Sequence, residues 1–215
     1  MTAPYDHEAL WLKAKLFINR AMDETDERSF DEKALWASLA LELLGKAALA
    51  RVSPLLIAEP TEEGNNLLIA SGLVEGDTRF LSVRAKTIYS RCHRAFKPFS
   101  DLEAMHITNA RNEYLHGSKA GFTSIPEAAW WPRFWAVAVI LVGALERETY
   151  HLVGLERADL IDKHLEQNKK NIENRTEMLI ERAKQRLAQH KAGTRRERRN
   201  HAARGLPCCY DVERG

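Results

Sequence analysis

Three side chains that could act on a phosphodiester stand close together in the stretch ITNARNEYLHG, residues 107 to 117. They are Arg111, Asn112 and His116. A guanidinium can hold negative charge that develops on phosphoryl oxygens, and an imidazole can move a proton near neutral pH. At ~100° per residue of a helix, Asn112 and His116 share nearly one face, and Arg111 lies ~140° round from His116. The stretch therefore predicts either phosphodiester chemistry or a plain helix end whose cations complement the macrodipole.

The helix that carries these residues has both a start and a stop signal. Ser100 is followed three residues later by Glu103, which is the capping-box pattern of a helix N-terminus. Gly117 follows His116 and is expected to adopt the left-handed conformation that ends many helices. We therefore expect a helix over residues 101–116. Its last free carbonyl groups would favour the protonated form of His116.

The rest of the chain also predicts helices, and the expected fold class is all-α. The run EKALWASLALELLGKAALARV follows a second capping box, Ser29 to Glu32, and is apolar nearly all round, so it should be central until Pro54 ends it. Residues 58–79 are rich in Gly and Asn and predict a connection with at most one short helix. No stretch predicts a strand. The other expected helices cover residues 6–22, 80–96 and 126–154, the last interrupted at Pro132.

Composition limits the class of protein. The net charge is only +2, so nucleic-acid contact must come from local patches and not from the charge of the whole molecule. The apolar run at 136–145 is well short of the ~20 residues that span a bilayer, and the N-terminus has no apolar signal core. Three cysteines without regular spacing favour a reducing compartment. We expect a cytoplasmic protein that makes no membrane contact.

The C-terminal third differs in character from the rest. Residues 155–191 predict a long charged helix with a thin apolar stripe, suited to packing along the domain or against a second copy. The expected division is a helical domain at 1–154, this arm at 155–192, and a basic, mobile tail at 193–215. The tail could attract RNA without sequence preference, or could be a solvated end. Its candidate RNA-binding residues are Arg195, Arg196, Arg198 and Arg199.

The arrangement of Arg111, Asn112 and His116 resembles the signature of the HEPN superfamily. That signature is an arginine, four to six further residues and a histidine, with a polar residue often directly after the arginine. The surroundings agree with it: the histidine ends a late helix, a glycine follows, and an earlier helix carries Glu42 within the apolar run LELLGKAAL. The resemblance covers residues 6–154. It implies a HEPN-like helical bundle, to which the long charged C-terminal helix is added.

What the resemblance implies for function is a metal-independent endoribonuclease of a toxin–antitoxin or phage-defence system. The 2′-hydroxyl of RNA would attack the adjacent phosphate, leaving a 2′,3′-cyclic phosphate and a 5′-hydroxyl. His116 would be the general acid or base, Arg111 would stabilise transition-state charge, and Asn112 would orient one of them or the phosphate. Two copies would meet with both Arg/His pairs in one cleft, which predicts a homodimer with a composite active site. An antitoxin or other neutralising partner is expected.

Three further residues are candidates for supporting roles. In the toxin branch silenced by nucleotidylation, a tyrosine stands two residues beyond the histidine; here that residue is Ser118, which leaves Tyr114 as the alternative target. Glu42 and Lys46 are four residues apart on one helix and are either a surface ion pair or cleft residues. We expect Glu42 to orient Arg111 or His116.

Other motifs predict less. The aromatic residues beside Pro132 could stack RNA bases but favour the core or a dimer interface; they are Trp130, Trp131, Phe134 and Trp135. Cys208 and Cys209 lack the second half of a zinc site, and there is no glycine-rich phosphate loop, so neither a metal nor a cofactor is expected. The alternative to a nuclease is a non-catalytic helical module that binds a nucleotide or RNA, or a scaffold in which Arg111 and His116 only finish a helix.

Overall fold

The computed structural model describes residues 5–25, 27–75, 81–118 and 120–170, together with residues 172, 173, 180, 184 and 187. These residues are mostly helical, and within these ranges the only β-pairing is an isolated antiparallel bridge between Ala58 and Ser82. The prediction of an all-α fold is confirmed. By its internal contacts the chain divides into two units, residues 1–168 and 169–215. All the labelled helices lie in the first unit.

Helix α2 (Phe30–Val52) is the central element, as its apolar sequence predicts. Ser29 caps it by accepting a hydrogen bond from the backbone N–H of Glu32 (3.3 Å). Helix α1 (His7–Ala21) packs along it through a buried stripe at helical spacing, which comprises Trp11, Ala14, Ile18 and Ala21. Many of the α2 residues that face its neighbours are alanines, so other helices can approach its backbone closely.

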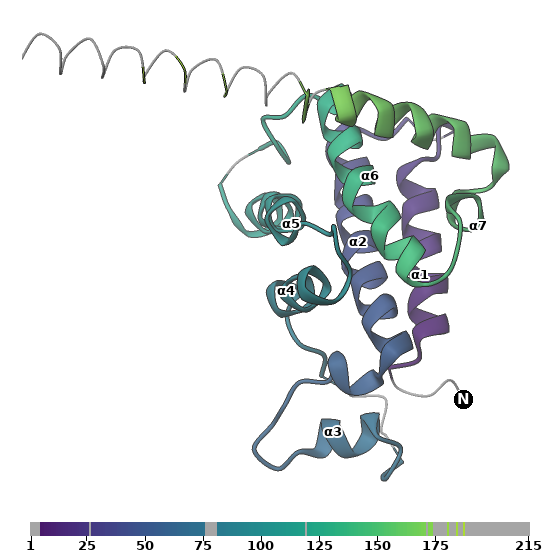
Figure 1. Cartoon of the computed structure of the whole chain (residues 1–215), viewed down its shortest axis with the longest axis vertical. Coiled ribbons are helices and arrows are strands. Elements are labelled where there is room, and N and C mark those ends of the chain that lie inside the picture. Colours follow the sequence, from purple (N-terminus) through teal and green to yellow (C-terminus); the bar gives the residue numbers. More distant parts are fainter. Residues whose placement is uncertain are drawn as a thin grey trace, which may run out of the picture. The chain divides into compact units, whose positions relative to one another are not determined.

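Helices α4 (Ala85–Ala95) and α5 (Asp101–His116) pack against α2, and Figure 1 shows them on the side of α2 away from α1. The approach of α4 is close at Gly45, where an added Cβ would lie 2.9 Å from Cγ2 of Ile88. Between α2 and α4 the chain forms a short 3-10 turn, η1 (Pro54–Leu56), and a short helix, α3 (Asn65–Ala70). The packing of α4 and α5 against α2 places α5 next to the central helix.

Two predicted helix boundaries are wrong. The helix expected from residue 80 begins at Ala85, because the backbone before it pairs with residues 57–59: the N–H of Val83 donates to the carbonyl of Ile57 (2.9 Å). The helix expected to run to 154 ends earlier, since α6 (Glu127–Ala144) stops at a turn in which Glu146 has φ 56°. A separate helix, α7 (Thr149–Val153), follows with its own cap at Glu148.

Helix α6 supplies much of the core. The predicted interruption at Pro132 is wrong: Pro132 lies inside α6, near its start, and the helix continues through this residue. The aromatic cluster is buried, with Trp130 and Phe134 stacked at 5.3 Å between ring centroids, so it forms core and not an exposed surface for bases. Residues 155–170 are helical as well, and Ile161 is fully buried. In the part of the chain that the structure describes, no helix is long and apolar enough to span a membrane.

Candidate active site

The site lies on α5, whose two faces differ sharply. The inner face carries the buried residues Ala104, Ile107 and Thr108. The outer face, nearest the solvent, carries exposed residues from Leu102 to His116. Ser100 begins the helix by accepting a hydrogen bond from the N–H of Glu103 (3.3 Å). The expected reciprocal bond of the capping box is replaced, because the Glu103 carboxylate instead pairs with Arg133 of α6 (2.7 Å), which fixes the helix against the core.

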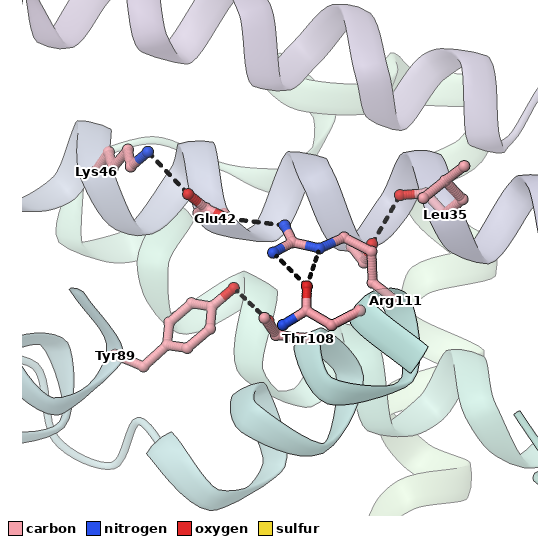
Figure 2. A network of polar contacts seen from close by, with 8 residues as sticks. Leu35, Glu42, Lys46, Tyr89, Thr108 and Arg111 are labelled. Carbon is pink, nitrogen blue, oxygen red and sulfur yellow. Dashed lines mark hydrogen bonds and ion pairs between the residues drawn. The ribbon is translucent and has the colours of Figure 1, made fainter. Parts of the chain in front are cut away.

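Arg111 lies on the inner side and is held from two directions. Its Nη1 donates to Oε2 of Glu42 on α2 (2.8 Å), and its Nε and Nη2 donate to Oδ1 of Asn112 (3.2 and 3.1 Å). Only 12% of the Arg111 side chain is exposed. Figure 2 shows the guanidinium between Glu42 on α2 and its own helix. These contacts fix the plane of the guanidinium, and they use one N–H of each nitrogen out of the five that an arginine offers.

Lys46 completes a cluster of three charges. Its Nζ lies 2.8 Å from Oε1 of Glu42, so one carboxylate bridges two cations. The side chains of Lys46 and Glu42 are 16% and 19% exposed. Burial alone would raise the pKa of Glu42, but Lys46 and Arg111 outweigh it and hold this pKa below its ordinary value. Glu42 is therefore ionised at neutral pH, and the cluster keeps one net positive charge in a poorly hydrated place.

A pair of buried hydroxyls lies near this cluster, and the sequence did not point to it. Thr108 donates from Oγ1 to the hydroxyl oxygen of Tyr89 on α4 (3.0 Å), one turn before Arg111 on the same face of α5 (Figure 2). Burial is the main cause that raises the pKa of Tyr89, so its hydroxyl stays neutral. The spacing of Thr108 and Arg111 was the available signal, because residues three apart share a helix face.

His116 is placed differently from Arg111. It is the last residue of α5 and is exposed, and its side chain forms no hydrogen bond or ion pair with any residue that the structure describes. The five residues from Arg111 to His116 turn the helix by ~140° beyond a full turn, so the two side chains leave α5 in different directions. Asn112 is also exposed and lies nearer to the His116 side. The imidazole is thus available to a substrate.

The end of α5 needs a glycine, though for a different reason than expected. Gly117 has φ −91° and ψ −175°, so the predicted left-handed cap is wrong. An added Cβ would instead lie 2.5 Å from the carbonyl oxygen of Glu113 and 2.9 Å from its Oε1. The Gly117 N–H donates to that same carbonyl (2.7 Å). A close approach to the last turn of the helix excludes a side chain here.

A groove of about 520 Å³ runs beside the site, between the outer part of α5 and the following loop. Asn109 and Glu113 line one wall, and residues 120–124 line the other. The loop is anchored where the N–H of Phe122 donates to Oδ1 of Asp31 on α2 (2.8 Å). Tyr114 is half-buried with its ring 5.8 Å from that of Phe122. The groove therefore lies along the second half of α5, where Glu113 stands three residues before His116.

The structure thus brings together Glu42, Lys46, Arg111 and Asn112, and leaves His116 apart at the helix end. The tail arginines and Cys208 and Cys209 lie outside the described residues. Among those that are described, no group of three His, Cys, Asp or Glu side chains could hold a metal ion. Comparisons of the chain with protein-family models, with curated proteins and with solved structures gave no match. The chemistry of this site therefore has to be argued from its own residues.

Proposed function

We propose that this protein is a metal-independent endoribonuclease of the HEPN type, acting as a toxin or phage-defence effector in the cytoplasm. One observation carries the proposal. A firmly held arginine with unused N–H donors, in a poorly hydrated cluster of net positive charge, stands five residues before an exposed histidine whose side chain has no partner among the described residues. The net positive charge of such a cluster favours the binding of an anion. A phosphodiester is an anion whose cleavage needs proton transfer, which an exposed imidazole can perform.

In the proposed reaction the 2′-oxygen of one nucleotide forms a bond to the adjacent phosphorus, and the bond to the 5′-oxygen of the next nucleotide breaks. The imidazole of His116 accepts the proton of the attacking hydroxyl, and the imidazolium so formed donates this proton to the leaving oxygen. The two remaining N–H groups of Arg111 bind the phosphoryl oxygens as their charge grows. Glu42 and Asn112 hold the guanidinium in place, so little reorganisation is needed at the moment of reaction.

A second copy of the chain would complete the site. Arg111 and His116 leave α5 in different directions, so a single helix end presents them poorly to one phosphate. The last turn of α5 is exposed, with Leu115, which stands four residues after Arg111 and beside His116, 49% exposed, and it offers a surface for another α5. In a symmetric pair each site would combine the arginine of one copy with the histidine of the other. The dimer, the RNA substrate and a neutralising antitoxin all belong to this proposal.

The test is cleavage of an end-labelled mixed RNA pool in EDTA by wild type, His116→Ala and His106→Ala. His106 is the matched control, since it is a second exposed histidine on α5. The expected result is cleavage by wild type and His106→Ala, with cyclic phosphate ends, and loss of cleavage in His116→Ala. Equal activity in all three proteins would mean that the cleavage does not depend on His116 and comes from a contaminant, which would contradict the proposal.

The shared site has its own test. Mixing Arg111→Ala with His116→Ala, each inactive, should restore about a quarter of wild-type activity, because half of the dimers would be mixed and one of their two sites would be intact. No recovery after subunit exchange would contradict a site shared between copies. If no protein cleaves RNA and wild type still binds RNA in a way that Arg111→Ala abolishes, the non-catalytic RNA-binding module becomes the better account.

A further inference from the structure

A second pocket, far along the chain from the α5 residues, opens where four segments of the first unit converge. It has a volume of about 480 Å³. Its walls come from the end of α1, the start of α2, the first half of α6 and residues 157–164 of the helix that follows α7. In α6 the lining residues Trp131 and Trp135 are four apart, and Arg157 and His164 are seven apart, so each helix offers one face.

Flat rings form the walls. The rings of Trp131 and His164 lie nearly parallel, at 26° and 6.5 Å between centroids, and Trp131 and Trp135 lie at 21° and 6.4 Å. Burial lowers the pKa of His164, so its imidazole is neutral at pH 7 and behaves as another flat ring. Trp135 is fully buried, and its Nε1 has no hydrogen-bond partner in the described part of the chain. Unsatisfied buried donors are uncommon in native proteins.

The charged residues at the pocket are not equivalent. Lys33 is half-buried, and its side chain makes no hydrogen bond or ion pair with any described residue. Arg157 uses Nη1 on Oδ1 of Asn19 (3.0 Å) and keeps other donors. Of the two acids, Glu127 accepts from Nε1 of Trp131 (3.1 Å) and Glu24 is exposed to water. Lys33 is therefore a half-buried cation whose side chain has no partner among the described residues, and such a group favours an anionic partner.

We propose that this pocket binds a small ligand that combines a planar aromatic ring with an anionic group. The ring would lie against Trp131 and His164, and the anion would meet Lys33 at the α2 wall. An aromatic pair that stacks is stabilised beyond the area that it buries. Such a ligand would tie residues 157–164 to α6 and so raise the melting temperature of the protein. The site is independent of the Arg111 cluster and of the proposed ribonuclease activity.

Isothermal titration of the wild-type protein tests the proposal with four probes. They are 2-naphthoate and 2-naphthyl phosphate, which are aromatic anions, naphthalen-2-ylmethylammonium, which has the ring with the opposite charge, and cyclohexanecarboxylate, which has the charge without the ring. We expect both aromatic anions to bind with Kd below ~1 mM and to raise the melting temperature, with the other two at least tenfold weaker. The tighter of the two anions identifies the preferred anionic group.

Three variants place the binding. Lys33→Met should weaken 2-naphthoate about tenfold, and Leu160→Trp, which puts a large ring at a 40% exposed lining position, should abolish it. Lys15→Met removes an exposed lysine of α1 outside the pocket and should leave the affinity unchanged. Circular dichroism checks that each variant folds. If only one of Lys33→Met and Leu160→Trp folds, the affinity of that variant is enough to locate the binding site. Three results would overturn the proposal. They are no binding of either aromatic anion, a cationic probe that binds as tightly as the aromatic anions, and equal affinity for 2-naphthoate in wild type and all folded variants.

Discussion

The two ends of the stretch from Arg111 to His116 on α5 differ in burial and in the number of their side-chain partners. Arg111 is 12% exposed, is bound by Glu42 from α2 and by Asn112, and lies over a buried hydroxyl pair. His116 is exposed at the last residue of the helix and has no partner among the described residues. The fold thus holds the guanidinium in place and leaves the imidazole exposed, as the proposed reaction requires of a group that binds phosphoryl charge and of a group that exchanges a proton.

The largest effect is expected at the free end. His116→Ala should lower RNA cleavage by ~10²–10⁴-fold, the usual range for a general acid or base. The melting temperature should stay within about 1 °C of wild type, because the side chain is exposed and makes no hydrogen bond or ion pair with any described residue. Kinetics and differential scanning calorimetry on one preparation measure both. A variant that loses stability together with activity would show that His116 belongs to the structure after all.

The held end should respond in both properties. Arg111→Ala should lower cleavage by at least ~10²-fold, and it should also lower the free energy of unfolding by ~1–3 kcal/mol because Glu42 loses a buried partner. Arg111→Lys keeps the charge but loses the planar fork, so it should recover more of the stability than of the activity. Urea unfolding followed by circular dichroism gives the free energies. An active Arg111→Ala would contradict the role assigned to the guanidinium.

Glu42→Gln sharpens the comparison through its dependence on pH. The pKa of Glu42 is lowered in the folded state, so its carboxylate contributes stability above its ordinary pKa, and this contribution is lost as the pH falls through the folded value. At pH 7 the variant should be ~1–2 kcal/mol less stable than wild type, with the gap closing below about pH 4. Glu62→Gln, an exposed loop carboxylate, is the matched control. If the difference in free energy of unfolding between wild type and Glu42→Gln did not change with pH, the charge of Glu42 would not be the source of the stabilisation.

The smallest effect is expected at the glycine between site and loop. Gly117→Ala places a Cβ 2.5 Å from the carbonyl oxygen of Glu113. We therefore expect the last turn of α5 to shift and the free energy of unfolding to fall by ~1 kcal/mol. Gly121→Ala adds a Cβ with no atom within 4 Å at a residue without positive φ, and should be neutral. Thermal unfolding of the pair measures the difference. Equal melting temperatures would mean that the close approach at Gly117 relaxes without cost.

The sequence anticipated whatever depends on local signals. Hydrophobic periodicity and the serine caps located α1, α2 and α5 to within a residue or two. It could not decide whether Glu42 meets Arg111 or His116, because these residues are brought together by the packing of α5 on α2, which no local pattern encodes. The same holds for the break between α6 and α7 and for the backbone pairing before α4, where a contact with a distant segment overrides a helical pattern.

The most direct test of the central claim uses two oligonucleotides that differ in one atom. Both carry the linkage that wild type cuts, one as RNA throughout and one with a single 2′-deoxy sugar on the 5′ side of that linkage. The account predicts that the RNA is cut in EDTA to a 2′,3′-cyclic phosphate and a 5′-hydroxyl, and that the deoxy linkage stays intact. Cleavage of both at equal rates, or a 3′-hydroxyl product, would contradict attack by the 2′-oxygen and the roles given to Arg111 and His116.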